Sequence, residues 1–280
     1  MLINTRTVAV EVLSKISHKP GLKMGYASLD EITYGVRPTE LIILAGRPGM
    51  GKSAAMADMI LTISNSSVPL VFSMEMGQTQ LIERLLSNLS GVAYQKAIRN
   101  LLQSSEKKRL LEAADTLSHR DILVEGSSLQ TPQQVEKTIK ALLDNKAPIS
   151  CVLIDHLQYM RTESYCSDPY ITVTEITKYL KAIAREYSIP IIVLCQLNRA
   201  VESRDTHRPR LSDLRDSGSI EQDADQIWFL YRPGYYEPHS TSNAAEIIVA
   251  KNRNGATGSA PVYWNAATMS FRRPPSLNDI

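Results

Sequence analysis

Residues 46–53 have the types and spacing that bind a nucleoside triphosphate. They read Gly-Arg-Pro-Gly-Met-Gly-Lys-Ser after the apolar run 41–45, which fits the pattern G-x-x-x-x-G-K-S. Its glycines let the backbone approach phosphate oxygens, and the freed N–H groups form an anion-binding nest. Lys52 can reach the β- and γ-phosphates, and Ser53 can offer its hydroxyl to Mg²⁺. The predicted nucleotide-binding residues are Gly46, Arg47, Pro48, Gly49, Met50, Gly51, Lys52, Ser53 and Ala54.

Two carboxylates follow later apolar runs, at positions where the carboxyl ends of parallel strands would hold ligands. Glu75 is placed to polarise the water that attacks a γ-phosphate, although an ordinary surface glutamate is the alternative. Asp155 has the position of the carboxylate that orders Mg²⁺, so Ser53 and Asp155 form the predicted metal site. His156 comes next, and its simpler interpretation is a hydrogen-bonded bystander.

Two further apolar runs end in residues suited to a γ-phosphate. The Gln196 carboxamide can donate and accept at once, which suits a reporter of nucleotide state, but a buried glutamine satisfied by backbone is the alternative. Lys251 and Arg253 follow the run 246–250, and such cations favour phosphoryl transfer, also when a neighbouring molecule supplies them. A solvated hairpin tip is their alternative. The candidate catalytic residues are therefore Lys52, Glu75, Asp155, Gln196, Lys251 and Arg253.

The polar segment 198–218 carries five arginines and four acids and follows Gln196 directly. Residues Arg215 to Gly218 can present a guanidinium and backbone N–H groups to one phosphate of a nucleic-acid strand. Because the segment has no Phe, Tyr or Trp, base stacking is not expected, and binding would be salt-sensitive and independent of base sequence. A mobile charged surface loop is the alternative.

Composition indicates an ordinary globular protein. The 280 residues suffice for one large α/β domain with a small appendage, and the formal net charge of +2 means that any field attracting nucleic acid must be local. Three cysteines without metal spacing suggest a reducing compartment. No run reaches the roughly 18 apolar residues of a membrane span, so we expect a cytoplasmic protein with no membrane partner.

From residue 41 onward the pattern alternates between strand and helix, which predicts an α/β fold with a parallel sheet buried between helices. The strand candidates are 41–45, 70–73, 151–154, 191–194 and 246–250. The helix candidates are 53–64, 78–89, 95–118, 132–145 and 171–187, with start signals at Ser105 and at Thr131-Pro132. Residues 1–19 have the spacing of an amphipathic helix too short to stand alone, so it must dock on this domain or on a neighbour. Another apolar run precedes Tyr231-Arg232-Pro233, a candidate border of the base pocket.

Six segments in order resemble the helicase motifs of the DnaB-type replicative helicases, between about Gly21 and Ser270. They are Gly-Arg-Pro-x-Met-Gly-Lys-Ser, Phe-Ser-Met-Glu-Met, Leu-Ile-Asp-His-Leu-Gln-Tyr-Met, Gln-Leu-Asn-Arg, Leu-Ser-Asp-Leu-Arg-Asp-Ser-Gly-Ser-Ile-Glu-Gln-Asp-Ala-Asp and Lys-Asn-Arg-Asn-Gly-x-Thr-Gly. The last two separate this family from other RecA-like ATPases.

The resemblance implies a RecA-like core over residues 20–280, with a mainly parallel twisted sheet and helices on both faces. It implies a homo-hexameric ring that encircles single-stranded DNA and translocates 5′ to 3′ with ATP and Mg²⁺. Lys251 and the arginine finger Arg253 would enter the site of the next protomer. By the same resemblance, Arg215, Asp216 and Gly218 would grip DNA, and residues 1–19 would be the linker helix that docks on the adjacent protomer.

The chain departs from the family pattern in three respects. It has no room for the N-terminal collar domain that binds primase in bacterial members, so we expect a part of a longer protein or a compact phage- or plasmid-type form. Whether the chain is part of a longer protein or a compact form decides its coupling to a primase or a helicase loader and the stability of its ring. His156 stands where tyrosine is usual, and Gly49 where serine is common. A RecA-like recombinase and an ATP-switched loader or regulator without unwinding activity are the alternative functions.

Overall fold

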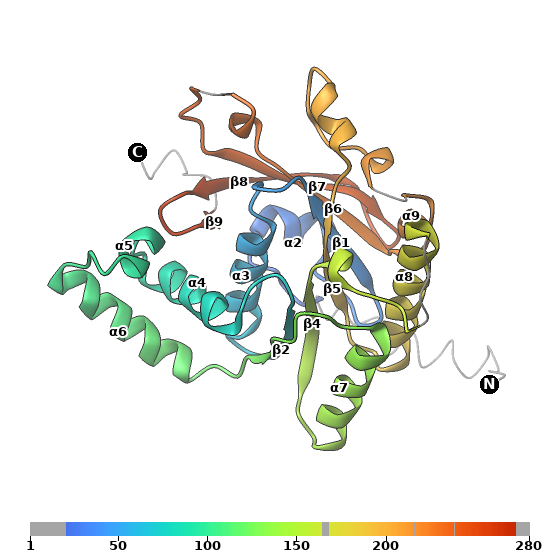
Figure 1. Ribbon diagram of the computed structural model, residues 1–280, viewed down its shortest axis with the longest axis horizontal. Helices are drawn as coiled ribbons and strands as arrows, with labels where there is room; N and C mark the ends of the chain where they lie inside the picture. The colour runs from blue at the N-terminus through green and yellow to red at the C-terminus, as the bar shows by residue number, and fades with distance from the viewer. Residues whose placement is uncertain (1–20, 164–167, 215–216, 238, 273–280) are drawn as a thin grey trace.

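The computed structural model describes residues 21–163, 168–214, 217–237 and 239–272, and its centre is one nine-stranded sheet (Figure 1). The strands lie in the order β3-β2-β4-β5-β1-β6-β7-β8-β9. Those from β3 to β6 are parallel and the rest antiparallel. Their bounds are β1 Leu41–Gly46, β2 Val68–Ser73, β3 Leu123–Glu125, β4 Ile149–Asp155, β5 Ile191–Gln196, β6 Gln226–Tyr231, β7 Ala244–Asn252, β8 Gly258–Asn265 and β9 Ser270–Arg272. The mainly parallel sheet predicted from the sequence is confirmed.

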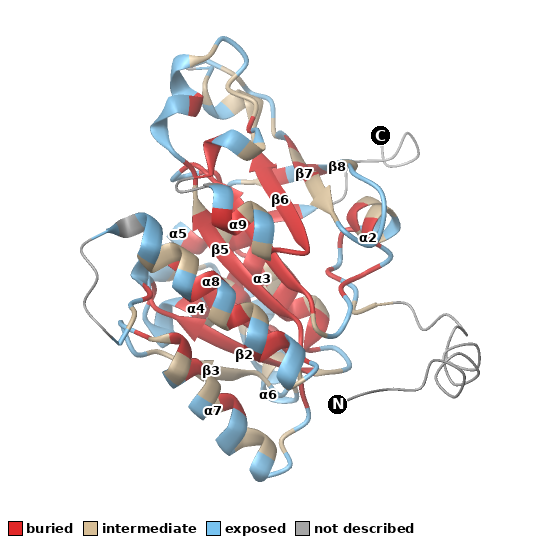
Figure 2. Ribbon diagram, turned by 90° about the vertical axis from the view of Figure 1, so that its right-hand side faces the viewer, coloured by how far each residue is buried: buried red, intermediate tan, exposed pale blue. Residues whose placement is uncertain are grey.

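Helices cover both faces of this sheet (Figure 1). Helices α2 (Ala27–Thr33), α3 (Lys52–Ile63) and α4 (Gln78–Ser90) pack on one face, and α7 (Pro132–Asp144), α8 (Pro169–Glu186) and α9 (Ser217–Asp223) on the other. In β1, Ile42 and Leu44 join the first core cluster, whereas Leu41, Ile43 and Ala45 join the second. The central strands are therefore buried on both sides (Figure 2), as a continuous apolar run requires.

Three sequence predictions about elements need correction. The run 246–250 lies in β7, which is antiparallel to β6, and its residues alternate between buried and partly exposed because it has one buried face. The predicted helix 95–118 is two helices, α5 (Tyr94–Ile98) and α6 (Ser104–Ser118). The chain turns between them at Asn100, whose φ of 54° cannot continue a helix, and Gln103 rather than Ser105 caps α6.

Other local signals are confirmed. The Thr131 hydroxyl accepts a hydrogen bond from the Gln134 N–H at 3.2 Å, and the Gln134 side chain accepts one from the Thr131 N–H at 2.8 Å, with Pro132 first in the helix. The sequence indicates strand β6 only by the apolar run before Tyr231, and it carries no signal for the place of this strand beside β1. Residues 1–19 lie outside the described part of the chain.

Candidate functional site

The phosphate loop connects β1 to α3, as its sequence predicts. Gly49 and Gly51 have φ values of 77° and 100°, a region that strains any residue with a Cβ. A Cβ on Gly51 would also lie 3.0 Å from the Phe271 ring and 3.1 Å from the Trp264 ring. The glycines are therefore required by backbone conformation and by space, and the first helical turn of α3 places Ser53 directly beyond the loop.

Lys52 lies over this loop. Its Nζ donates to the carbonyl of Gly46 at 3.1 Å and to that of Arg47 at 3.4 Å. Burial lowers the pKa of Lys52, and the carboxylate of Asp155 opposes that shift. The ammonium is thus held among loop carbonyls, where a phosphate oxygen would give it a stronger partner.

Asp155 ends β4 beside Ser53 and is fully buried. Among the described residues, neither of its carboxylate oxygens accepts a hydrogen bond of ordinary geometry. Burial raises the pKa of Asp155 to about 6, and the nearby Ser53 hydroxyl lowers it. Buried anionic oxygens whose only nearby hydrogen-bond donor, in the part of the chain that the structure describes, is a serine hydroxyl fit Mg²⁺. No three His, Cys, Asp or Glu side chains in the described ranges gather to hold a metal, so phosphate oxygens and water would supply the other ligands.

Glu75 follows β2 and pairs with His156. The distance from His156 Nε2 to a carboxylate oxygen of Glu75 is 3.4 Å, and the Glu75 side chain is 46% exposed. Burial lowers the pKa of His156, and Glu75 raises it. His156 is thus in contact with a candidate catalytic carboxylate, so the bystander interpretation understates its position.

Gln196 ends β5 and is held by Gln158, which the sequence did not single out. The Gln158 carboxamide accepts from the Gln196 N–H at 3.2 Å and donates to the Gln196 carbonyl at 3.3 Å. The Gln196 side chain is half-buried and, within the described part of the chain, makes no hydrogen bond, which argues against a glutamine satisfied by backbone. The sequence signals for Gln158 were its place three residues after Asp155 and within the motif Leu-Ile-Asp-His-Leu-Gln-Tyr-Met.

Lys251 and Arg253 lie at the amino ends of the parallel strands, opposite the phosphate loop. The Arg253 N–H donates to the carbonyl of Asp225 at 2.9 Å, and the Asp225 N–H donates to the carbonyl of Leu41, at the start of β1. The phosphate loop begins at the other end of β1, after Gly46, so five residues of strand, about 16 Å, separate the two levels. Both side chains donate to backbone carbonyls at the end of α9, and Lys251 Nζ lies 2.7 Å from the carbonyl oxygen of Ala224. The structure therefore does not bring them to their own chain's phosphate loop.

Ion pairs hold the predicted nucleic-acid segment in place as far as residue 214, although many of its residues are exposed. Arg204 pairs with Asp213 at 2.5 Å, and Arg208 makes two hydrogen bonds of 2.8 Å to Glu246 of β7. These contacts argue against a mobile charged loop over this part. Arg215 and Asp216 lie outside the described residues, and Gly218 is exposed in the first turn of α9.

The other loop residues differ in what they offer a nucleotide. The Arg47 side chain is buried and points to residues 197–202, so its part in nucleotide binding, which stays a prediction, would fall to its backbone. Pro48 is exposed, and Met50 and Ala54 are buried. Arg232 donates to the Gly49 carbonyl at 3.1 Å and therefore borders the phosphate loop. A place for Tyr231-Arg232-Pro233 at the base pocket stays a prediction.

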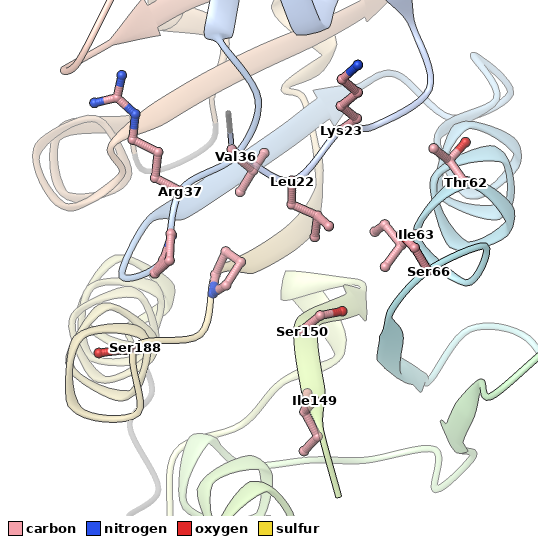
Figure 3. Close-up of a pocket in the computed structure, with 13 residues that line it drawn as sticks. Leu22, Lys23, Val36, Arg37, Thr62, Ile63, Ser66, Ile149, Ser150 and Ser188 are labelled. Atoms are coloured by element: carbon pink, nitrogen blue, oxygen red, sulfur yellow. The ribbon is translucent and has the colours of Figure 1, made fainter. Parts of the chain in front are cut away.

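A groove of about 840 Å³ lies away from this site (Figure 3). It is at the amino ends of the parallel strands, where Leu22 and Val36 face Ile149 and Ser150 at the start of β4. None of the candidate catalytic residues lines it. The carboxyl edge of the sheet, rather than this groove, holds the described candidates for phosphate and metal.

Comparison with known families decides what kind of domain this is. The family model of the DnaB-like helicase C terminal domain matches residues 21–273. The chain belongs to this family. Replicative DNA helicase DnaB of Buchnera aphidicola subsp. Baizongia pistaciae is 34% identical over 276 residues, covering 96% of this chain and 60% of the relative. The DnaB of Haemophilus influenzae is 33% identical, over 94% of this chain and 58% of its own.

Solved structures agree with the family and with its RecA-like fold. One that is described as an ATPase domain superimposes with a TM-score of 0.88 at 33% identity and covers 96% of this chain and 97% of its own. A DnaB-like replicative helicase, described with its interactions with primase, gives the same TM-score and identity over 65% of its length. The chain spans about 60% of the curated DnaB relatives it matches, and no helix within the described ranges is long and apolar enough to cross a bilayer.

Proposed function

We propose that this DnaB-family chain is the ATP-hydrolysing motor of a replicative DNA helicase. The curated relatives named replicative DNA helicase DnaB support this function. In the proposal, copies of the chain form a hexameric ring around single-stranded DNA, translocate 5′ to 3′ and unwind duplex. The candidate hydrolytic groups Glu75, Asp155 and Arg253 argue against a purely ATP-switched regulator, which could lose them. The segment Leu-Arg-Asp-Ser-Gly at 214–218 argues against a recombinase.

The chemistry follows from the residues at the carboxyl edge of the sheet. The loop N–H groups and Lys52 bind the phosphates, and Ser53 and Asp155 would hold Mg²⁺, which neutralises charge on the phosphates when it is bound. Glu75, held by His156, orients the attacking water and accepts its proton. Gln196 is placed to detect the γ-phosphate, since Gln158 fixes its backbone.

One observation supports the shared-site part of the proposal. Lys52, Glu75, Asp155 and Gln196 lie at the carboxyl ends of the parallel strands, whereas Lys251 and Arg253 lie at the amino ends. A side chain cannot cross the packed sheet from Asp225 to the phosphate loop. This separation supports a role for Arg253 at the nucleotide of another copy. A closed ring satisfies this geometry for every copy, because each one offers its phosphate loop to one neighbour and its cations to the other.

DNA and protein partners complete the proposal. Arg215, Asp216 and Gly218 would contact the phosphates of single-stranded DNA in the central channel, and residues 1–19 would dock on the adjacent protomer next to the domain at 20–280. A primase or a helicase loader is the proposed protein partner, since a relative of known structure is described with primase.

Two assays test this function. ATP hydrolysis by the purified chain should rise when single-stranded DNA is added, and a forked duplex with a free 5′ tail should be unwound in preference to one with only a 3′ tail. Turnover that is complete in a strict monomer and indifferent to DNA would contradict the proposal. Unwinding that requires the 3′ tail would reverse the proposed direction.

A further inference from the structure

Arg47 is a phosphate-loop residue whose side chain leaves the loop. It is only 7% exposed, although a buried guanidinium is costly unless it is paired. Its Nη1 donates to the carbonyl of Leu197 at 2.8 Å, and its Nε donates to the carboxylate of Glu202 at 2.8 Å. The two bonds fix the guanidinium toward the segment after β5 and away from the phosphates.

The segment held by Arg47 leads directly to the candidate DNA contacts. The Leu197 N–H donates to the carbonyl of Gly46 at 3.3 Å, so backbone as well as side chain joins this segment to the phosphate loop. Leu197 pairs with Leu214 in an antiparallel bridge, and the Asn198 N–H donates to the carbonyl of Asp213 at 2.8 Å. Leu214 immediately precedes the predicted DNA-binding residues in the sequence.

We propose that Arg47 is a positioning residue that couples nucleotide binding to DNA binding. A shift of the loop backbone on nucleotide binding is carried by the two arginine bonds to Leu197 and Glu202, and by the bridge from Leu197 to Leu214. Arginine suits this role because its planar fork reaches two acceptors from fixed directions, which a lysine ammonium does not reproduce. The inference rests on the proposed function, because it needs both an ATP site and a DNA site.

The test measures the nucleotide dependence of DNA affinity. The dissociation constant for a fluorescent oligothymidylate is compared between Mg²⁺ with a non-hydrolysable ATP analogue and Mg²⁺ with ADP, and the ratio is the coupling factor. In the unmodified protein we expect at least about fivefold, the lower end of typical couplings. Arg47→Gln should bring the ratio close to 1, because it loses the fork that reaches both acceptors. Glu202→Ala, which removes one acceptor, should lower the ratio and leave the affinity for a fluorescent nucleotide near that of the unmodified protein. Arg47→Lys, which can keep one of the two bonds, should give an intermediate ratio.

Arg208→Gln is the matched control. It removes an ion pair of the same length, to Glu246, in the same segment but without contact to the phosphate loop, so it should keep the ratio. Thermal unfolding shows whether each variant folds. If Arg47→Gln fails to fold, Glu202→Ala still tests the inference, because it changes only a half-exposed side chain.

The possible failures can be told apart. If the unmodified protein does not bind the oligonucleotide, the proposed function is wrong. If it binds DNA but its ratio is 1, the inference alone is wrong. The same holds if both variants keep the ratio, if Arg208→Gln abolishes it equally, or if Arg47→Gln loses nucleotide as completely as Lys52→Ala.

Discussion

Asp155→Asn should stabilise the nucleotide-free protein while it abolishes hydrolysis. Burial raises the pKa of Asp155 from 3.8 to about 6, a difference of about two units, and each unit corresponds to about 1.4 kcal/mol. A raised pKa means that the folded state holds its proton more tightly than the unfolded state. The stabilising contribution of this group is therefore complete below about pH 4 and is lost as pH rises through 6. At neutral pH the native aspartate should cost up to about 3 kcal/mol of unfolding free energy, which the uncharged amide avoids.

Urea unfolding at acid and neutral pH measures this difference. We expect the variant to exceed the native protein by about 1 to 3 kcal/mol near pH 7 and to match it near pH 4. Added Mg²⁺ and ADP should narrow or reverse the gap, because only the native site gains the binding energy of the ion. An Asp155→Asn variant equal to or less stable than the native protein at pH 7 would refute the reasoning.

Asp58→Asn is the control for this prediction. Burial raises the pKa of Asp58 to about 6 as well, but its carboxylate accepts from the Phe271 N–H at 2.7 Å and from the Tyr26 hydroxyl at 2.8 Å. Both of these bonds go to one oxygen, and the Asn88 amide donates to the other. An amide nitrogen at either position would face a donor, so the loss of hydrogen bonds should cancel the gain from removing the charge. Stabilisation by both substitutions would mean that burial alone, and not the number of hydrogen bonds to the carboxylate, sets the effect.

Three further changes have defined outcomes. Gly51→Ala should lower the unfolding free energy by about 1–3 kcal/mol in urea unfolding and weaken nucleotide binding, because Gly51 has a φ of 100° and two rings crowd the new Cβ. Gly77→Ala, whose new Cβ would meet no heavy atom of a described residue beyond its chain neighbours within 4 Å, should change neither quantity. Gln158→Leu should lower the turnover number for ATP with little change in nucleotide affinity, since it frees the backbone of the γ-phosphate sensor; equal loss of affinity would contradict that division. Thr131→Ala should cost about 1 kcal/mol through its helix cap, and calorimetry that finds no change would show that the cap is redundant.

The sequence predicted where several candidate residues lie because each of them stands at the end of an apolar run. Apolar runs followed by Glu75, Asp155 and Gln196 specify parallel strands whose carboxyl ends meet at one edge, and the structure brings these residues to the phosphate loop. The order of the strands, and the insertion of β6 between β1 and β7, depend on packing across the whole domain and leave no local signal.

The direction of individual side chains was beyond the sequence. The phosphate-loop motif places Arg47 among the residues predicted to bind the nucleotide. Its guanidinium instead donates to Glu202, which lies 155 residues away in the sequence. Gln158 likewise has a role only because β4 and β5 lie side by side, so that its carboxamide reaches Gln196. Contacts of this kind depend on tertiary structure, whereas glycine conformations and helix caps depend on neighbouring residues.

The most direct test of the shared site mixes two inactive proteins. Arg253→Ala copies keep an intact phosphate loop, and Lys52→Ala copies keep an intact arginine, so an interface between one of each contains a complete site. ATP hydrolysis with single-stranded DNA should therefore recover in the mixture above the level of either variant alone. A mixture that stays as inactive as its two components, while mass measurements show that they assemble together, would contradict the central claim.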